Sequence, residues 1–199
     1  MKVKDKVVFF ISFSSLIGYI YFMFNKNIFN ATQLLMLSIF ILLPIFIEKI
    51  IKYNISDLMH YIYIVFLLLH FILGEVCMFY INVKLFDTFL HYCSAIVICL
   101  LGYGIINYFV KENYYYFKVV FSIMFSICLE YIWELLEYCI DEVFLTNMQR
   151  YIKNNSTLIG HNALSDTMKD MYVAVIGCVS FLLIVNIKKI KNIKLINKK

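Results

Sequence analysis

The chain has few charged residues and few residues that interrupt helices. Asp, Glu, Lys and Arg make up 16% of its 199 residues, compared with about 25% in an ordinary soluble domain. It contains one proline and six glycines, so long helices can run without a break. Hydrophobic residues reach 63%, which is more apolar surface than a soluble domain of this size can bury. The composition argues against a soluble enzyme and a disordered chain, and it indicates an integral membrane protein.

Other absences narrow the class further. The six cysteines show no Cys-x-x-Cys spacing, which argues against a secreted disulfide scaffold, and we interpret them as small packing residues. The motifs HExxH and GxSxG are missing, which argues against the hydrolase classes built on them. The net charge of +5 comes from the chain ends and short loops, so it does not indicate a nucleic-acid partner.

Six apolar segments are long enough to cross a bilayer, which requires about 20 residues each. They cover about residues 7–24, 29–47, 58–80, 86–110, 117–140 and 168–187. The sequence therefore predicts an all-α, polytopic bundle of six spans that forms a single integral membrane domain over residues 1–199. Pro44 is the one residue expected to kink a helix, near the end of the second span. The longest loop, residues 141–167, has room for a short interfacial helix.

The distribution of basic residues orients this topology. Three lysines precede the first span, two lie in the second loop, two in the fourth, and six in residues 188–199, whereas five basic residues fall on the other side. Cytoplasmic loops carry the excess of Lys and Arg in membrane proteins. We therefore expect both termini in the cytoplasm, with residues 188–199 forming a basic tail that contacts anionic lipid.

Ionisable side chains of the last four predicted spans fall at a similar depth. The third and fifth spans run outward and the fourth and sixth run inward, yet all four place acids or histidines in the outer half of the bilayer. A charge at the membrane centre costs about 2.5–3.5 kcal/mol, so ionisable residues there are usually functional. The candidate metal ligands are His70, His91, Glu130, Glu134 and Asp170.

The spacing of these residues adds a second constraint. Residues four positions apart share a helix face, and three pairs have this spacing: Asp87/His91, Glu130/Glu134 and Asp166/Asp170. Glu75 follows His70 by five positions, which is about 140° around an α-helix. We therefore expect His70 to face the site and Glu75 to cap it or to meet the headgroups.

Carboxylates and imidazoles together are ordinary ligands of Zn, Mn or Fe. A bound divalent cation would also offset the repulsion between clustered carboxylates. Glu137 and Asp166 are the candidate general bases of such a site. Asp87, Glu75 and Arg150 are further polar candidates, and Arg150, the only arginine, is suited to pair with a carboxylate or a substrate phosphate.

Three functions fit this arrangement. The first is a metal-assisted hydrolase or transferase that acts on lipid or envelope precursors. The second is a proton- or cation-coupled transporter, although the sequence shows no inverted repeat and offers few helix breaks. The third is a non-catalytic assembly partner, in which the polar residues only hydrogen-bond the helices to one another.

Four segments, in order, resemble a known family. HFILGEVCMFY, DTFLH, EYIWELLE and DTMKDMYVAVIG, within residues 58–180, are similar to the YjdF-like bacterial inner-membrane proteins. The resemblance implies an inner-membrane location and a polar core, but no reaction, because that family has no settled biochemical function. A more distant similarity joins the same motifs to the VanZ-like membrane proteins, from which the chain departs at Ala174, where that pattern usually has Asn.

Overall fold

The computed structural model describes residues 3–51, 53–153, 156–186 and 196–198. These residues include six helical stretches that are long and apolar enough to cross a membrane. The expectation of an all-α, polytopic bundle is therefore confirmed. The chain divides into two compact units, one of Met1–Asp87 with Lys194–Lys199 and one of Thr88–Ile193, which we call the first and the second unit.

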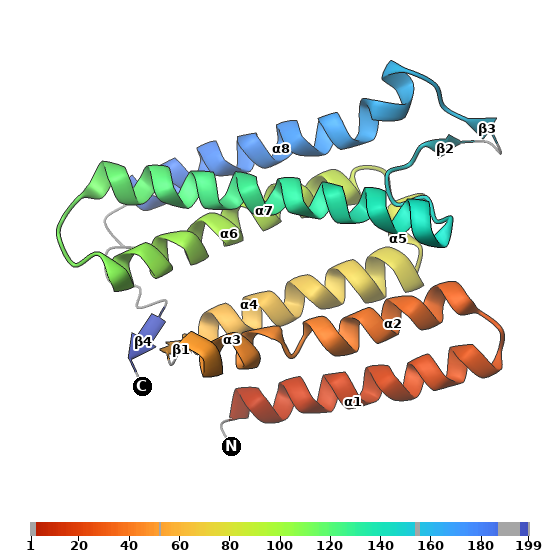
Figure 1. Cartoon of the computed structure of the whole chain (residues 1–199), viewed down its shortest axis with the longest axis horizontal. Helices are drawn as coiled ribbons and strands as arrows, with labels where there is room; N and C mark the ends of the chain where they lie inside the picture. The colour runs from red at the N-terminus through yellow and green to blue at the C-terminus, as the bar shows by residue number, and fades with distance from the viewer. Residues whose placement is uncertain (1–2, 52, 154–155, 187–195, 199) are drawn as a thin grey trace. The chain divides into compact units, whose positions relative to one another are not determined.

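The first unit contains the first three spans (Figure 1). Its helices are α1 (Val3–Phe24), α2 (Ile28–Phe40), α3 (Leu43–Ile51), α4 (Asp57–Leu67), η1 (Leu68–Val76) and α5 (Phe79–Asn82). Apolar side chains of the three spans, including Val8, Leu37 and Phe71, form one buried core. This packing holds α1 against α2 and α2 against η1.

The second span is broken at the position where proline was expected to act. α2 ends at Phe40 and α3 begins at Leu43. Pro44 has no N–H to donate to the carbonyl of Phe40, four residues earlier, and its ring crowds that carbonyl. The span is therefore two helices joined by a short turn.

The third span changes helix type in its middle. After the α-helical segment α4, the segment η1 is a π-helix of nine residues. In a π-helix each residue bonds to the one five positions away, so residues i and i+5 lie close to one another on the same side. This corrects the inference about His70 and Glu75: their separation around an α-helix does not apply, and both side chains are buried.

The second unit consists of α6 (Phe86–Phe109), α7 (Tyr115–Phe144) and α8 (His161–Asn186), with the first two residues of α6 counted in the first unit. α6 and α8 approach closely at Gly177, where an added Cβ would lie 2.7 Å from the carbonyl oxygen of Tyr92 and 2.9 Å from Ala95 Cβ. Small side chains at this seam, such as Ala95 and Ala174, are buried in the core of the unit.

The helix ends differ by a few residues from the approximate span ends expected from the sequence. The third span ends at Val76 rather than 80, since Met78 is in the left-handed conformation. α7 continues to Phe144 and α8 begins at His161, not 168, so the loop between them is shorter than predicted. This loop carries a hairpin of β2 (Ile152–Lys153) and β3 (Ser156–Thr157) instead of an interfacial helix. The additional turns of α7 and α8 lie outside the apolar runs, because a helix can close its backbone hydrogen bonds in polar sequence too.

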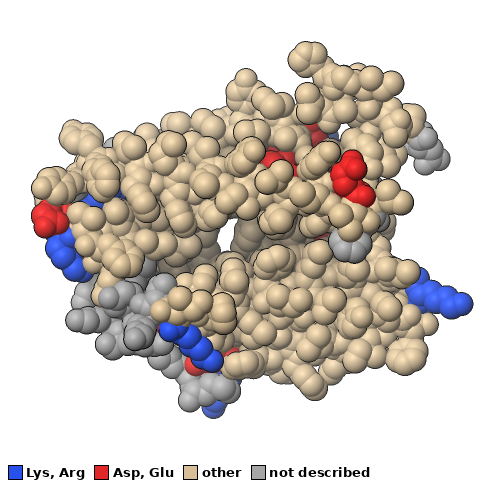
Figure 2. All heavy atoms as spheres, viewed as in Figure 1, with Lys and Arg blue, Asp and Glu red and all other residues tan. Residues whose placement is uncertain are grey.

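The basic tail lies mostly outside the described residues. Of residues 188–199, the structure describes only β4 (Ile196–Lys198), which pairs antiparallel with β1 (Tyr53–Ile55). Figure 2 shows a face of the molecule on which uncharged side chains cover most of the helices, with Lys and Arg mainly toward the helix ends. That distribution is expected of helices that span a bilayer.

The α6–α8 seam predicts that Gly177→Ala destabilises the protein. The new methyl group would meet backbone, which cannot rotate away, so we expect a loss of about 1–3 kcal/mol and a lower Tm in detergent. Gly18→Ala is the matched control, because its Cβ would meet only the end of the Leu34 side chain, at 2.6 Å from Cδ1. Equal losses in the two variants would contradict a tight backbone contact at Gly177.

Candidate functional site

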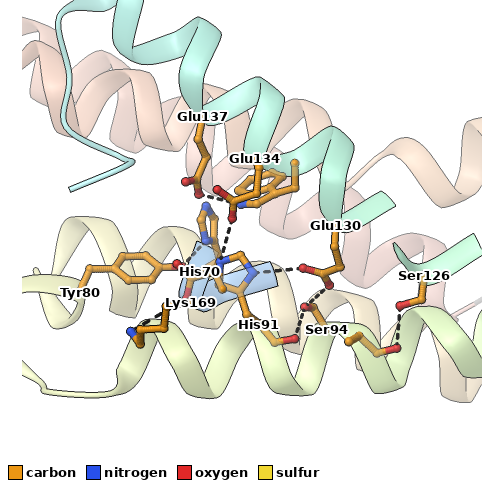
Figure 3. A network of polar contacts seen from close by, with 12 residues as sticks. His70, Tyr80, His91, Ser94, Ser126, Glu130, Glu134, Glu137 and Lys169 are labelled. Carbon is orange, nitrogen blue, oxygen red and sulfur yellow. Dashed lines mark hydrogen bonds and ion pairs between the residues drawn. The ribbon is translucent and has the colours of Figure 1, made fainter. Parts of the chain in front are cut away.

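The centre of the candidate site is His91, in the second turn of α6. Its side chain is buried, and Nδ1 lies 3.1 Å from Oε2 of Glu130 on α7 (Figure 3). Nε2 lies 3.9 Å from Oε1 of Glu134, one turn further along α7. The imidazole therefore has a carboxylate on each of its two nitrogen sides, and both carboxylates come from one face of α7.

Glu130 is held in place by a second contact. The hydroxyl of Ser94, one turn after His91 on α6, donates a hydrogen bond to Oε1 of Glu130 at 2.5 Å. Each oxygen of this buried carboxylate therefore faces one polar group of α6. When Nδ1–H of a neutral His91 donates to Glu130, Nε2 keeps its lone pair and is available as a ligand.

Three side chains of α6 and α8 come within metal-binding range of one another. Ligand atoms of Asp87, His91 and Asp170 all lie within 4.8 Å of each other. Asp87 precedes His91 by one turn on α6, and Asp170 is buried on α8. In a tetrahedral site with ligands at 2.0–2.2 Å from the ion, neighbouring ligand atoms are about 3.4 Å apart, so the three side chains would have to draw together by about 1 Å to share one cation.

The remaining acids of α7 continue along the same helix. Glu137 is half-buried and accepts a hydrogen bond from Nε1 of Trp133 at 2.7 Å, which fixes its carboxylate. Asp141 is fully buried one turn further on. Because Glu130, Glu134, Glu137 and Asp141 are separated by three or four residues, these acids form a stripe on one side of α7.

The other predicted residues of the second unit lie around the start of α8. Asp166 is half-buried one turn before Asp170, and Lys169 places Nζ 4.0 Å from Oδ1 of Asp170. Arg150 is half-buried in the loop between α7 and α8, with a positive φ of 53°. Asp166 and Arg150 thus lie near the same end of α8 as the candidate ligand Asp170.

His70 and Glu75 lie on η1 in the first unit. Nδ1 of His70 is hydrogen-bonded to the hydroxyl of Tyr80, a residue that the sequence argument did not select. An added Cβ at Gly74 would run into the ring of Tyr80, so glycine is required there for this contact. That His70 and Glu75 act together with His91 stays a prediction.

Sequence reasoning also missed a buried polar cluster in the first unit. Nζ of Lys4 lies 2.8 Å from Oε1 of Glu48, and Nε2 of His60 lies 3.1 Å from the same oxygen. Glu48 also accepts a hydrogen bond from the backbone N–H of Ile55, and Lys4 donates a hydrogen bond to the backbone carbonyl oxygen of Ile55. The sequence marks Lys4 only as a topology signal, because each of these residues lies near a span end, where isolated charges are common.

The comparisons with known proteins agree with the membrane architecture. A family model described as "Predicted membrane protein (DUF2238)" matches residues 6–190. No curated protein and no solved structure matches the chain. The family match covers all the helices that carry the candidate site.

The geometry predicts that Glu130→Gln changes the tautomer of His91. The amide can keep its oxygen toward Ser94, and its NH₂ group then faces Nδ1, so Nδ1 must accept and the proton moves to Nε2. ¹⁵N NMR of the histidine rings should show Nδ1–H in the parent protein and Nε2–H in the variant. The exposed His161 serves as an internal control, and an unchanged His91 signal would rule out this hydrogen bond.

Proposed function

The chain belongs to the DUF2238 family of predicted membrane proteins, and on that premise we propose that it is a metal-dependent hydrolase or transferase of the membrane. The observation that carries this proposal is the grouping of Asp87, His91 and Asp170 within 4.8 Å. One imidazole and two carboxylates are a donor set suited to Zn, Mn or Fe.

The surroundings of His91 support the same interpretation. Histidines that bind metals commonly donate their other ring N–H to a carboxylate, which fixes the tautomer and the ring orientation. Glu130 is placed for this role by its 3.1 Å contact with Nδ1 and by its bond from Ser94. In this proposal Glu130 orients the ligand His91, and Glu134, near Nε2, is a further ligand.

A divalent cation in this site would supply electrostatic activation of a water molecule or of a carbonyl or phosphoryl oxygen. The residues of the chain would accept a proton and bind the substrate. Glu137, oriented by Trp133, or Asp166 would accept a proton from the attacking water or hydroxyl group. Arg150 and Lys169 would hold a negative charge on the substrate.

The depth of the site suggests a substrate of the membrane surface. α7 has 30 residues, which is about 45 Å, whereas the hydrocarbon core is about 30 Å thick. Asp87 is in the first turn of α6, and Glu134 and Glu137 are in the second half of α7. Metal ligands near helix ends are accessible to a lipid headgroup or to a lipid-linked envelope precursor.

The side of the membrane is proposed from the charge distribution. The excess of basic residues at the termini and in two loops favours cytoplasmic termini in the inner membrane, with the tail on anionic lipid. The site would then open to the outer face.

Metal binding tests the proposal directly. Protein purified in detergent without chelators should retain one divalent ion in elemental analysis, and after chelation it should bind Mn²⁺ or Zn²⁺ again in a titration. His91→Gln should lose this binding because it removes the imidazole ligand. His161→Gln is the matched control, since His161 is exposed. Failure of the parent protein to bind either ion would refute the proposal.

A second function, ion-coupled transport, is favoured by one observation. The second span breaks between Phe40 and Leu43, and the third contains the π-helix η1. Interrupted spans are typical of transporters. If this function is correct, proteoliposomes should show a pH- or cation-driven flux that Glu130→Gln abolishes, because the carboxylate that takes up the proton or cation is gone. The absence of flux in the parent protein would argue against transport and leave the metal site as the better explanation.

A further inference from the structure

Asp141, at the end of the acidic stripe on α7, is hydrogen-bonded to three residues of the loop that follows the helix. Its side chain is buried, and Oδ1 accepts hydrogen bonds from the hydroxyl of Thr146 at 2.5 Å and from N–H of Met148 at 2.7 Å. Oδ2 accepts a third bond, from N–H of Gln149 at 2.9 Å. A buried carboxylate with three donors is a rigid attachment, because each donor would otherwise be left unsatisfied.

The same loop is attached to α8. Nε2 of Gln149 donates to the hydroxyl of Thr167 at 3.1 Å. Thr167 precedes Asp170 by one turn of α8, so the loop and the candidate ligand are one helical turn apart. Asp141, Gln149 and Thr167 therefore form a chain of hydrogen bonds from α7 to α8.

The loop itself has a conformation that needs support. Leu145, at the start of the loop, and Arg150, which precedes its β-hairpin, have positive φ angles of 53°. Residues other than glycine disfavour this region and stay there only where surrounding contacts enforce it. The bonds from Thr146, Met148 and Gln149 to Asp141 are such contacts.

Asp170 lies between two attachments of α8. Deeper in the helix, Gly177 packs on the backbone of α6, and the hydroxyl of Tyr92 donates to that of Ser180 at 3.0 Å. Nearer the start of α8, the bond from Gln149 joins the helix to the loop, in addition to the packing of α7 against α8. Loss of the Gln149 bond would therefore loosen the first turns of α8 beside His91 and Asp87.

We infer that Asp141 is a positioning residue of the candidate metal site, which acts through Gln149 and Thr167 to keep Asp170 beside His91. The inference rests on the proposed function. No direct contact of Asp141 with a metal or a substrate is involved.

Metal affinity tests the inference through two variants. Asp141→Asn exchanges Oδ2 for an NH₂ group that cannot accept from Gln149, and Gln149→Leu breaks only the bond to α8. We expect both to weaken Mn²⁺ or Zn²⁺ binding by about 10–100-fold, as for other outer-shell partners of metal ligands. Glu142→Gln is the matched control, because it removes an exposed carboxylate from the next position of the same helix.

Two further measurements separate positioning from a general loss of fold. In a double-mutant cycle, Asp141→Asn and Asp170→Asn should be non-additive in metal affinity, because the first acts through the second. Hydrogen exchange of residues 161–170 should accelerate in Asp141→Asn and Gln149→Leu without metal, whereas Glu142→Gln should match the parent protein. Additive losses, or parental affinity in both variants, would overturn the inference.

The exchange experiment also distinguishes the two proposals. If the parent protein takes up no metal, the proposed function fails. Unchanged exchange of residues 161–170 in both variants would overturn the positioning role of Asp141 by itself.

Discussion

The hydrogen bond between His91 and Glu130 is the interaction on which the polar centre of the second unit depends. A carboxylate within a bilayer is costly unless another group neutralises it or hydrogen-bonds to it. Glu130 has the imidazole on one oxygen and the hydroxyl of Ser94 on the other. This arrangement joins α6 to α7 and fixes the direction of the His91 ring, which then faces the carboxylates of Asp87 and Asp170.

The packing around this centre explains how polar residues are accommodated in an apolar bundle. α6 and α8 approach through small residues, with Gly177 against the backbone of Tyr92. In membranes helices gain little from the hydrophobic effect between them, so close backbone contact and hydrogen bonds take a larger share. The hydrogen bond of Tyr92 to Ser180 joins α6 to α8, and that of Ser126 to the carbonyl of Ala95 joins α7 to α6. These contacts hold the candidate metal ligands of α6, α7 and α8 together at one end of the unit.

The first unit uses polar residues in a different way. Lys4, Glu48 and His60 are buried together where three spans begin or end, and the backbone of Ile55 hydrogen-bonds to both Glu48 and Lys4. The pairing neutralises a lysine and a glutamate at the edge of the membrane. Pro44 and the π-helix η1 interrupt two of the three spans. This unit is therefore less regular than the second, whose three helices run unbroken.

The sequence by itself determined the membrane class and the six apolar helices, because these follow from the length of the apolar runs. Helical periodicity also places Asp87 with His91, and Glu130 with Glu134, on one face of its helix. Only the tertiary structure decided that Glu130 meets Ser94, that Glu75 shares a π-helical segment with His70, and that Asp141 binds the loop before α8. Spacing along one helix cannot reveal contacts between helices or a change of helix type, since both are set by the packing of side chains distant in sequence.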